Sequence, residues 1–205
     1  MKKAMDNNRD LKTQKRLRYG FTIIELVIVI AIVVIITAVV LLRQKDFDNT
    51  TLLKNTGYEF ALSVKEAQSY GVSVRRELGN VGGRYGIHIN LDSPKSTILY
   101  TDNNVQNNSY DVGEERRVDV FEAPFSIKSV CVVPMGGGEE CSNTVGSSIR
   151  GLEILFVRPN PDALLYVVRV GNVVESVSEA RVSIGTAKGK TIDVVISNIG
   201  LVSVL

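Results

Sequence analysis

The feature that most constrains the fold is an uninterrupted apolar run from Phe21 to Leu42. Its 22 residues comprise nineteen apolar side chains, two threonines and one Glu. As an α-helix, the run would be about 33 Å long, enough to cross a bilayer core of roughly 30 Å. Fifteen of its residues are β-branched, which favours strands in water. In lipid, a single segment must bond its backbone internally, so we predict a membrane-spanning helix.

Two other interpretations of the apolar run fit less well. A buried core helix of a water-soluble protein is usually shorter than this run. A secretory signal peptide has an apolar core of about 7–15 residues, followed by small residues at its cleavage site. Here the run ends in Leu41-Leu42-Arg43-Gln44, without such a site. We therefore do not expect ordinary signal-peptide cleavage.

Charge before the run predicts its orientation. Residues 1–20 carry seven Lys or Arg and two Asp, a local charge of +5. Positive flanks remain cytoplasmic, so we expect a single-pass protein of the inner or cytoplasmic membrane with residues 43–205 outside. The whole-chain charge of +2 leaves −3 for residues 21–205. A nucleic-acid-binding domain usually shows the opposite balance, so we do not expect nucleic acid as a partner.

Glu25 is the unusual residue of the run, because an ionised carboxylate is costly in lipid and marks a functional candidate. One interpretation is that it snorkels to the headgroups. A sharper one comes from its context, Arg18-Tyr19-Gly20-Phe21-Thr22-Ile23-Ile24-Glu25. This segment resembles the prepilin motif of type IV pilins and type II secretion pseudopilins.

The resemblance implies how the chain is processed and assembled. A prepilin peptidase would cut between Gly20 and Phe21 and methylate the new N-terminus; a glycine lets a protease approach the backbone closely. In that family, Glu25 would pair with the Phe21 amine of a neighbouring subunit and set the axial register. Expected partners are other pilin or pseudopilin subunits, the prepilin peptidase, an inner-membrane platform protein, an assembly ATPase and membrane lipids.

The sequence also departs from the family. Many major pilins have a Gly inside this helix and a Pro near its end, whereas the matching stretches here are Val33-Val34-Ile35 and Leu41-Leu42-Arg43. Without a Pro to remove a backbone N–H, the helix should remain continuous. The departure favours a pseudopilin or a minor pilin.

Residues 43–70 are predicted to continue the helix to about 49 residues, or roughly 73 Å. Gly57 should weaken it by about 1 kcal/mol relative to Ala. Gly71 is suited to a left-handed C-cap. Residues at helical spacing would form one buried face, namely Leu53, Gly57, Phe60, Ala61, Val64 and Ala67.

From residue 72 onward, the pattern predicts strands. A first strand would begin with Val72-Ser73-Val74, and Tyr85, Ile87 and Ile89 alternate with polar or small residues. Further strands are expected at 96–101, 117–121, 126–133, 151–157, 163–170, 180–185, 191–197 and 201–205. Turns at Lys188-Gly189 and Asn198-Ile199-Gly200 would form hairpins.

These elements predict an α+β fold in which a long N-terminal helix, membrane-spanning in its first half, packs on a β-rich, mainly antiparallel globular domain. The expected organisation is a cytoplasmic leader (1–20), a long helix (21–70) with its transmembrane half at 21–42, and an extracytoplasmic domain (71–205). The junction Glu66–Val74 looks like that of H-type pseudopilins and FimT-type minor pilins. Those proteins also end in a strand pair around a Gly, much like Ile196–Val204.

Cys131 and Cys141 lie outside the membrane in this topology, with a flexible Pro134–Gly138 bend between them. We favour a disulfide over two free thiols; closing so short a loop would stabilise the fold by about 2–3 kcal/mol. The Asn- and Asp-rich segment Thr101–Glu115 offers oxygens to a calcium ion, but its spacing matches no defined calcium loop. We expect a solvated surface loop there.

Three functions remain to be weighed. We expect a structural filament subunit, in a pilus, a secretion pseudopilus or a DNA-uptake device. The alternative is a minor pilin that binds DNA or a surface through a basic patch, for which the candidates are Arg75, Arg76, Arg84, Arg116 and Arg117. An enzyme is not expected. The single histidine, His88, is interpreted as a surface residue, and the sequence has neither a nucleophile motif nor a phosphate-binding loop. No cofactor or metal is expected.

Overall fold

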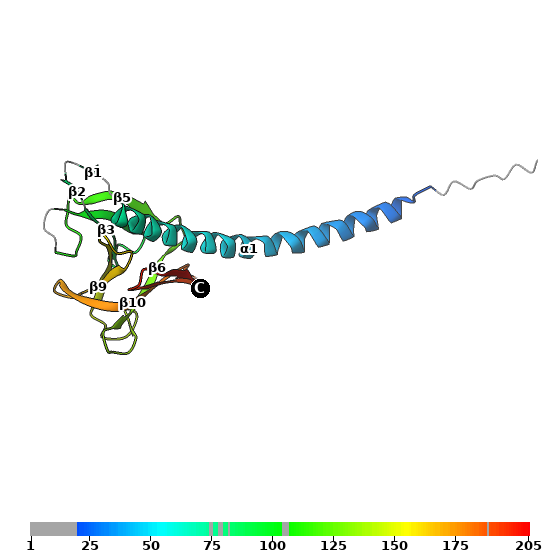
Figure 1. Ribbon diagram of the computed structural model, residues 1–205. Helices are drawn as coiled ribbons and strands as arrows, with labels where there is room; N and C mark the ends of the chain where they lie inside the picture. Colours follow the sequence, from blue (N-terminus) through cyan, green and yellow to red (C-terminus); the bar gives the residue numbers. More distant parts are fainter. Residues whose placement is uncertain (1–19, 74–75, 78–79, 82, 104–106, 188) are drawn as a thin grey trace, which may run out of the picture. The chain divides into compact units, whose positions relative to one another are not determined.

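The computed structural model describes residues 20–73, 76–77, 80–81, 83–103, 107–187 and 189–205. Apart from Gly20, the predicted leader lies outside this part of the chain. The chain forms two compact units, up to Lys45 and from Asp46 to Leu205, and each is treated by itself. Helix α1 (Ile23–Val72) begins in the first unit and ends in the second (Figure 1).

In the first unit, the stretch of α1 from Ile23 to Leu41 is apolar and exposed. The stretch Ile23–Leu41 has a mean hydropathy of 3.3 over 19 residues, and none of it is buried. Thr37 donates its hydroxyl to the carbonyl of Val33 at 2.7 Å, so this polar group is satisfied within the helix. Within the described residues, this is the one helix long and apolar enough to cross a membrane.

In the second unit, α1 buries the face that its spacing predicts. Leu53, Phe60, Val64 and Ala67 are at most 4% exposed, which confirms the predicted face. A Cβ on Gly57 would lie 3.0 Å from Cγ2 of Ile192 in β11 (Thr191–Ser197). The glycine predicted as a weak point therefore admits a close approach between helix and sheet.

The end of α1 corrects two predictions. The helix runs over 50 residues without a break, as the missing proline indicates, but it passes through Gly71 and ends at Val72. Gly71 is helical, and a Cβ there would lie 2.6 Å from both Cβ and the carbonyl oxygen of Phe156. Gly71 thus serves close packing and not a left-handed C-cap. The strand predicted to begin at Val72 is also wrong at that residue, because Val72 is helical and helix packing overrides its β-branched preference; Val74 lies outside the described residues.

Ten antiparallel strands form the main sheet of the second unit, which confirms the α+β fold. They are β3 (Arg84–Asn90), β4 (Ser96–Asp102), β5 (Glu115–Val120), β6 (Ser126–Pro134), β7 (Glu140–Cys141), β8 (Ile149–Phe156), β9 (Ala163–Arg169), β10 (Val173–Gly185), β11 and β12 (Val202–Val204). A separate hairpin pairs β1 (Arg76–Glu77) with β2 (Asn80–Val81). The predicted turn at Gly200 joins β11 to β12, and Gly189, with φ +86°, lies in the turn before β11; Lys188 is outside the described residues.

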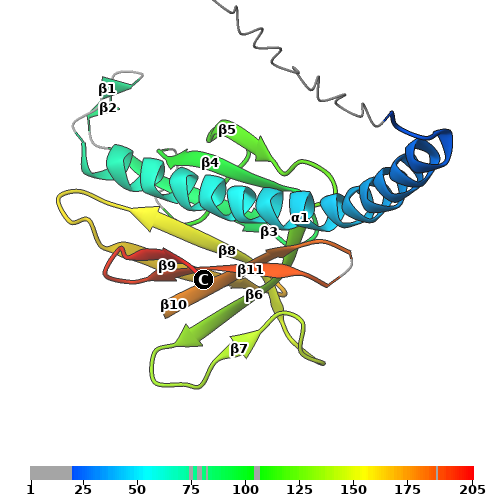
Figure 2. The ribbon, with the colours of Figure 1, turned by 90° about the vertical axis from the view of Figure 1, so that its right-hand side faces the viewer.

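Strand β10 begins at Val173, seven residues before its predicted start, and organises the sheet (Figure 2). Val177 pairs with Leu165 of β9 on one edge and with Pro134 of β6 on the other. Further along, β10 pairs with β11 and β6. One long strand therefore links β9 and β11 along the same edge, and the sheet order runs β12-β11-β10-β9-β8-β3-β4-β5.

Polar contacts hold the second half of α1 to both ends of this sheet. Ser63 donates its hydroxyl to Asp119 Oδ2 of β5 at 2.9 Å. Gln68 donates Nε2–H to the carbonyl of Gly200, in the β11–β12 turn, at 3.1 Å. Because β5 and β12 are the first and last strands in the sheet order, these bonds fix the helix against the two edges of one curled sheet.

Candidate functional site

The predicted processing site lies directly before the first turn of α1. Gly20 and Phe21 are exposed, and a Cβ on Gly20 would meet no atom within 4 Å. The peptide bond between them is therefore open to an approaching protease.

Thr22 caps the helix, a role that sequence reasoning missed. The amide N–H of Glu25 donates to Thr22 Oγ1 at 3.3 Å, and the amide of Leu26 donates to the Thr22 carbonyl at 3.2 Å. Thr22 to Glu25 has the T-x-x-E spacing of a capping box, which was the available signal. Glu25 also lies in the first turn, where the helix dipole favours a negative side chain. Glu25 therefore has a local structural role beside its predicted intersubunit one.

Cys131 and Cys141 are joined in a disulfide in the second unit. The two residues are directly opposite each other in the register of β6 and β7, a two-residue strand that was not predicted. The bond thus fastens the segment after β6 back onto the sheet. This position is in mid-domain, far along the chain from the C-terminal strand pair.

We expect the bond to be present in the native protein. Peptide mapping without reductant should show Cys131 and Cys141 in one linked pair with no free thiol. Replacing both with Ser should lower the free energy of unfolding by about 2–3 kcal/mol, since the closed loop is short. Complete alkylation of both cysteines without reductant would contradict this prediction.

Of the three candidate arginines whose side chains the structure describes, Arg84 and Arg117 lie beside carboxylates, and Arg116 donates Nε–H to Thr101 Oγ1 at 2.8 Å. Arg117 contacts Glu66 at 2.7 Å and Asp119 at 2.6 Å, and hydrogen bonds to these two residues raise the pKa of its guanidinium. Arg84 lies 3.8 Å from Asp102. Arg75 and the side chain of Arg76 lie outside the described residues. Paired guanidiniums are poor phosphate ligands, so the described part of this patch does not support nucleic-acid binding.

The segment Thr101–Glu115 is exposed at Asn107 and from Asp111 to Gly113, in agreement with the predicted solvated loop, but two of its carboxylates are buried; residues 104–106 lie outside the described residues. Asp102 is 0% exposed and Glu114 is 4% exposed. Glu114 accepts the amide N–H groups of Asn103 and Asp111, both at 3.2 Å. Burial raises the pKa of Asp102 above its ordinary range. These two carboxylates therefore lie inside the fold, whereas exposed residues of the loop lie between them.

His88 is likewise not the surface residue that its strand position predicts. It lies directly opposite Glu153 in the register of β3 and β8, and its Nδ1 is 2.6 Å from Glu153 Oε1. Glu153 is 0% exposed and also accepts Ser109 Oγ at 3.3 Å and the Tyr110 amide at 3.4 Å. One carboxylate oxygen thus ties the 107–111 segment to the sheet.

Tyr100 completes this polar cluster on β4. Burial, followed by the charge of Glu153, raises the pKa of the Tyr100 phenol. Among the described residues, Tyr100 Oη, Asp102 Oδ1 and Glu153 Oε2 have no hydrogen-bond partner. Sequence reasoning missed Glu153, although a single Glu within the apolar segment Gly151–Phe156 was a signal that a carboxylate enters the sheet.

Comparison with known protein families identifies the N-terminal segment. Residues 15–41 match the family described as the prokaryotic N-terminal methylation motif. The matched segment contains Gly20, Phe21, Thr22 and Glu25 and covers most of the apolar stretch of α1. Comparisons with curated proteins and with solved structures find no match. The chain therefore has a type IV pilin-like N-terminus, followed by an antiparallel β domain.

Proposed function

We propose that this chain is a structural subunit, a pseudopilin or minor pilin, of a type IV pilus-like or type II secretion filament. The observation that carries the proposal is the methylation motif at residues 15–41, positioned so that its Gly20-Phe21 bond immediately precedes an exposed apolar helix. An exposed apolar helix is stable in lipid or against other such helices. In the proposed pathway, the helix lies in the membrane first and then packs against the helices of other subunits in the filament.

Assembly, and not turnover, is the proposed mechanism. A prepilin peptidase removes the basic leader after Gly20 and methylates the Phe21 amine. The subunit then lies in the inner membrane with residues 43–205 outside. The positive charge of residues 1–20 supports this orientation. The platform protein and assembly ATPase transfer it into the filament, where apolar helices pack together and Glu25 of one subunit pairs with Phe21 of the next. No cofactor or catalytic step takes part.

The subunit type is proposed on two features of the fold. Helix α1 has no proline and runs continuously to Val72, unlike the helix of many major pilins. The domain ends in the β11–β12 pair around Gly200, which supports an H-type pseudopilin or FimT-type minor pilin. The Glu66–Val74 junction gives less support, because its residues up to Val72 are helical.

Mass spectrometry of the chain expressed with its native assembly genes tests the proposal. We expect a mature N-terminus at Phe21 carrying one N-methyl group. Gly20→Val should block cleavage, because a β-branched side chain at this position obstructs the peptidase, and should leave the precursor beginning at Met1. An intact Met1 terminus in the unmodified chain, or a cut beyond Leu42, would overturn the prepilin interpretation.

A further inference from the structure

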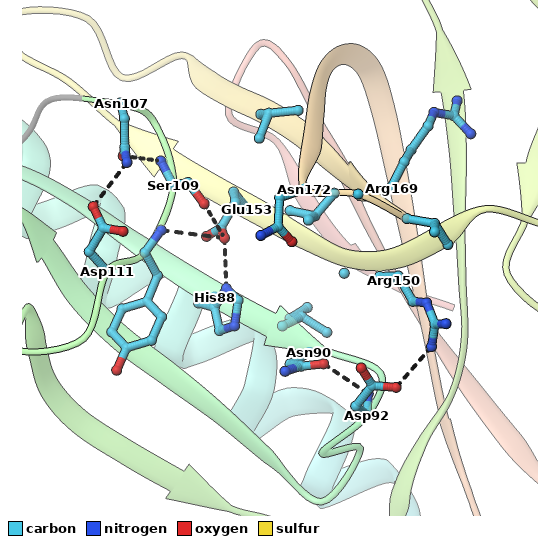
Figure 3. A pocket seen from close by; sticks show the side chains of 17 residues that line it. His88, Asn90, Asp92, Asn107, Ser109, Asp111, Arg150, Glu153, Arg169 and Asn172 are labelled. Carbon is cyan, nitrogen blue, oxygen red and sulfur yellow. Dashed lines mark hydrogen bonds and ion pairs between the residues drawn. The ribbon is translucent and has the colours of Figure 1, made fainter.

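A polar pocket of about 670 Å³ lies on the face of the sheet opposite α1 (Figure 3). This volume is within the roughly 300–1,000 Å³ usual for small-molecule sites. The residues on its floor and walls that matter here are His88, Asn90, Glu153, Val168, Val170, Asn172 and Val174. No feature of pilin assembly proposed above uses this pocket.

The floor is formed by the outward-facing residues of three adjacent strands. Ile87 and Ile89 of β3 point into the core, so His88 and Asn90 point away from it. Gly151 of β8 pairs with Asn90 on one side and Val168 of β9 on the other. Because Gly151 carries no side chain, the pocket is deepest at this position of the floor. The polar groups of β3 lie on one side of it and Val168 of β9 lies on the other.

The two arginines of the pocket are paired with carboxylates, whereas its Asp111 accepts the side-chain amide of Asn107 at 2.9 Å. Arg150 contacts Asp92 at 3.1 Å. Arg169 donates to Glu175 at 2.8 Å and to Glu140 at 3.0 Å, and also to Ser148. Glu153 accepts hydrogen bonds within the protein, from Ser109 and the Tyr110 amide, and lies 2.6 Å from His88 Nδ1. A guanidinium already paired with a carboxylate offers little to an anion, and the carboxylates of Glu153 and Asp111 repel one, so the pocket is not built to select an anion.

The groups left for a ligand are amides and one ring nitrogen. His88 Nδ1 lies 2.6 Å from Glu153 Oε1, so the carboxylate takes up this nitrogen and Nε2 is the ring nitrogen left for a ligand. Asn90 uses its Oδ1 to accept the Asp92 amide, which leaves its NH₂ group as a donor. Figure 3 shows the side chains of His88, Asn90 and Asn172 gathered around the same space. Together they offer two side-chain amides and one ring nitrogen to a ligand.

One wall of the pocket is apolar. Val174 of β10 is the cross-strand partner of Val168, so the two side chains lie on the same face of the hairpin. Val170, 54% exposed at the hairpin tip, continues this valine wall (Val168, Val170 and Val174). The pocket therefore offers hydrogen-bonding groups and a strip of apolar surface.

We propose that this pocket binds a neutral saccharide. A pyranose has hydroxyl groups around its edge, each able to donate and accept, and a C–H face that is apolar. The amides and His88 Nε2 suit the hydroxyls, and the valine wall suits the C–H face. The paired guanidiniums and the carboxylate of Asp111 disfavour sulfated or carboxylated sugars. This function is additional to filament assembly and independent of it.

The test is binding of the full chain to an array of neutral and sulfated glycans, in a phosphocholine detergent that has no sugar headgroup. The strongest neutral glycan is then titrated by calorimetry. Asn172→Gly should weaken binding about tenfold by removing an amide, and glycine readily adopts the φ of +59° found there. Val170→Asn should also weaken binding several-fold, because it places a polar group in the valine wall.

The matched control is Val145→Asn, the same exchange at a fully exposed residue outside the pocket, which should bind like the unmodified chain. Thermal unfolding midpoints should be the same for all three variants. The proposal is overturned if no neutral glycan binds, if Asn172→Gly and Val170→Asn bind as well as Val145→Asn, or if only sulfated glycans bind and salt abolishes the signal.

Discussion

Replacing Glu25 with Ala is expected to exclude the chain from filaments while leaving it at normal levels in the membrane. Insertion should be unchanged or slightly improved, because a costly carboxylate is removed from an apolar segment. In the proposed filament, the same change leaves the Phe21 amine of a neighbour unpaired in lipid. Losing one partner of a buried ion pair costs about 3–5 kcal/mol, compared with under about 1 kcal/mol for exposed pairs. The measurement is the amount of chain in membranes and in sheared filaments.

The capping of α1 by Thr22 makes further variants informative. If Glu25 acts only in the capping box, Glu25→Gln should assemble normally, because an amide also fits the N3 position. If it forms the ion pair, Glu25→Gln should fail like Glu25→Ala. Thr22→Ala removes the Glu25 N–H bond to the cap but keeps the charge, so it should lower incorporation only slightly. Normal incorporation of Glu25→Ala would show that the carboxylate snorkels and has no role in register.

The elements with a clear hydrophobic period were predictable from the sequence. The buried face of α1 follows from spacing at Leu53, Phe60 and Val64, and the core face of β3 from alternation at Ile87 and Ile89. In each case a repeated local pattern matches burial on one side of a single element. The methylation motif was equally visible, because its residues are contiguous in sequence.

The features that were missed depend on contacts between distant segments. The first residues of β10, from Val173 to Ser176, are exposed and show no buried alternation, although they pair with β9. His88 and Glu153 are 65 residues apart and meet through strand register. The burial of Asp102 likewise depends on how the following segment folds back. A single sequence gives little information on such pairings.

Gly71→Asn is expected to destabilise the β domain more than Gly71→Ala, and Ala itself should cost about 1–3 kcal/mol. A Cβ at Gly71 would lie 2.6 Å from both Cβ and the carbonyl oxygen of Phe156, and backbone of a central strand cannot move aside cheaply. The gain in helix propensity from Gly to Ala, about 1 kcal/mol, offsets only part of this cost. Urea unfolding followed by near-ultraviolet circular dichroism of the tyrosines measures the change.

The comparison with Asn separates two explanations for this glycine. A left-handed C-cap would accept Asn at little cost, because Asn tolerates that conformation, whereas a close helix–strand contact penalises its larger side chain. Gly57→Ala is the matched control within α1. Its Cβ would meet only side-chain atoms of Ile192, at 3.0–3.4 Å, which can adjust, so stability should stay within about 1 kcal/mol of the unmodified chain. An Asn variant as stable as the unmodified chain would restore the C-cap explanation and remove the close contact as the reason for Gly71.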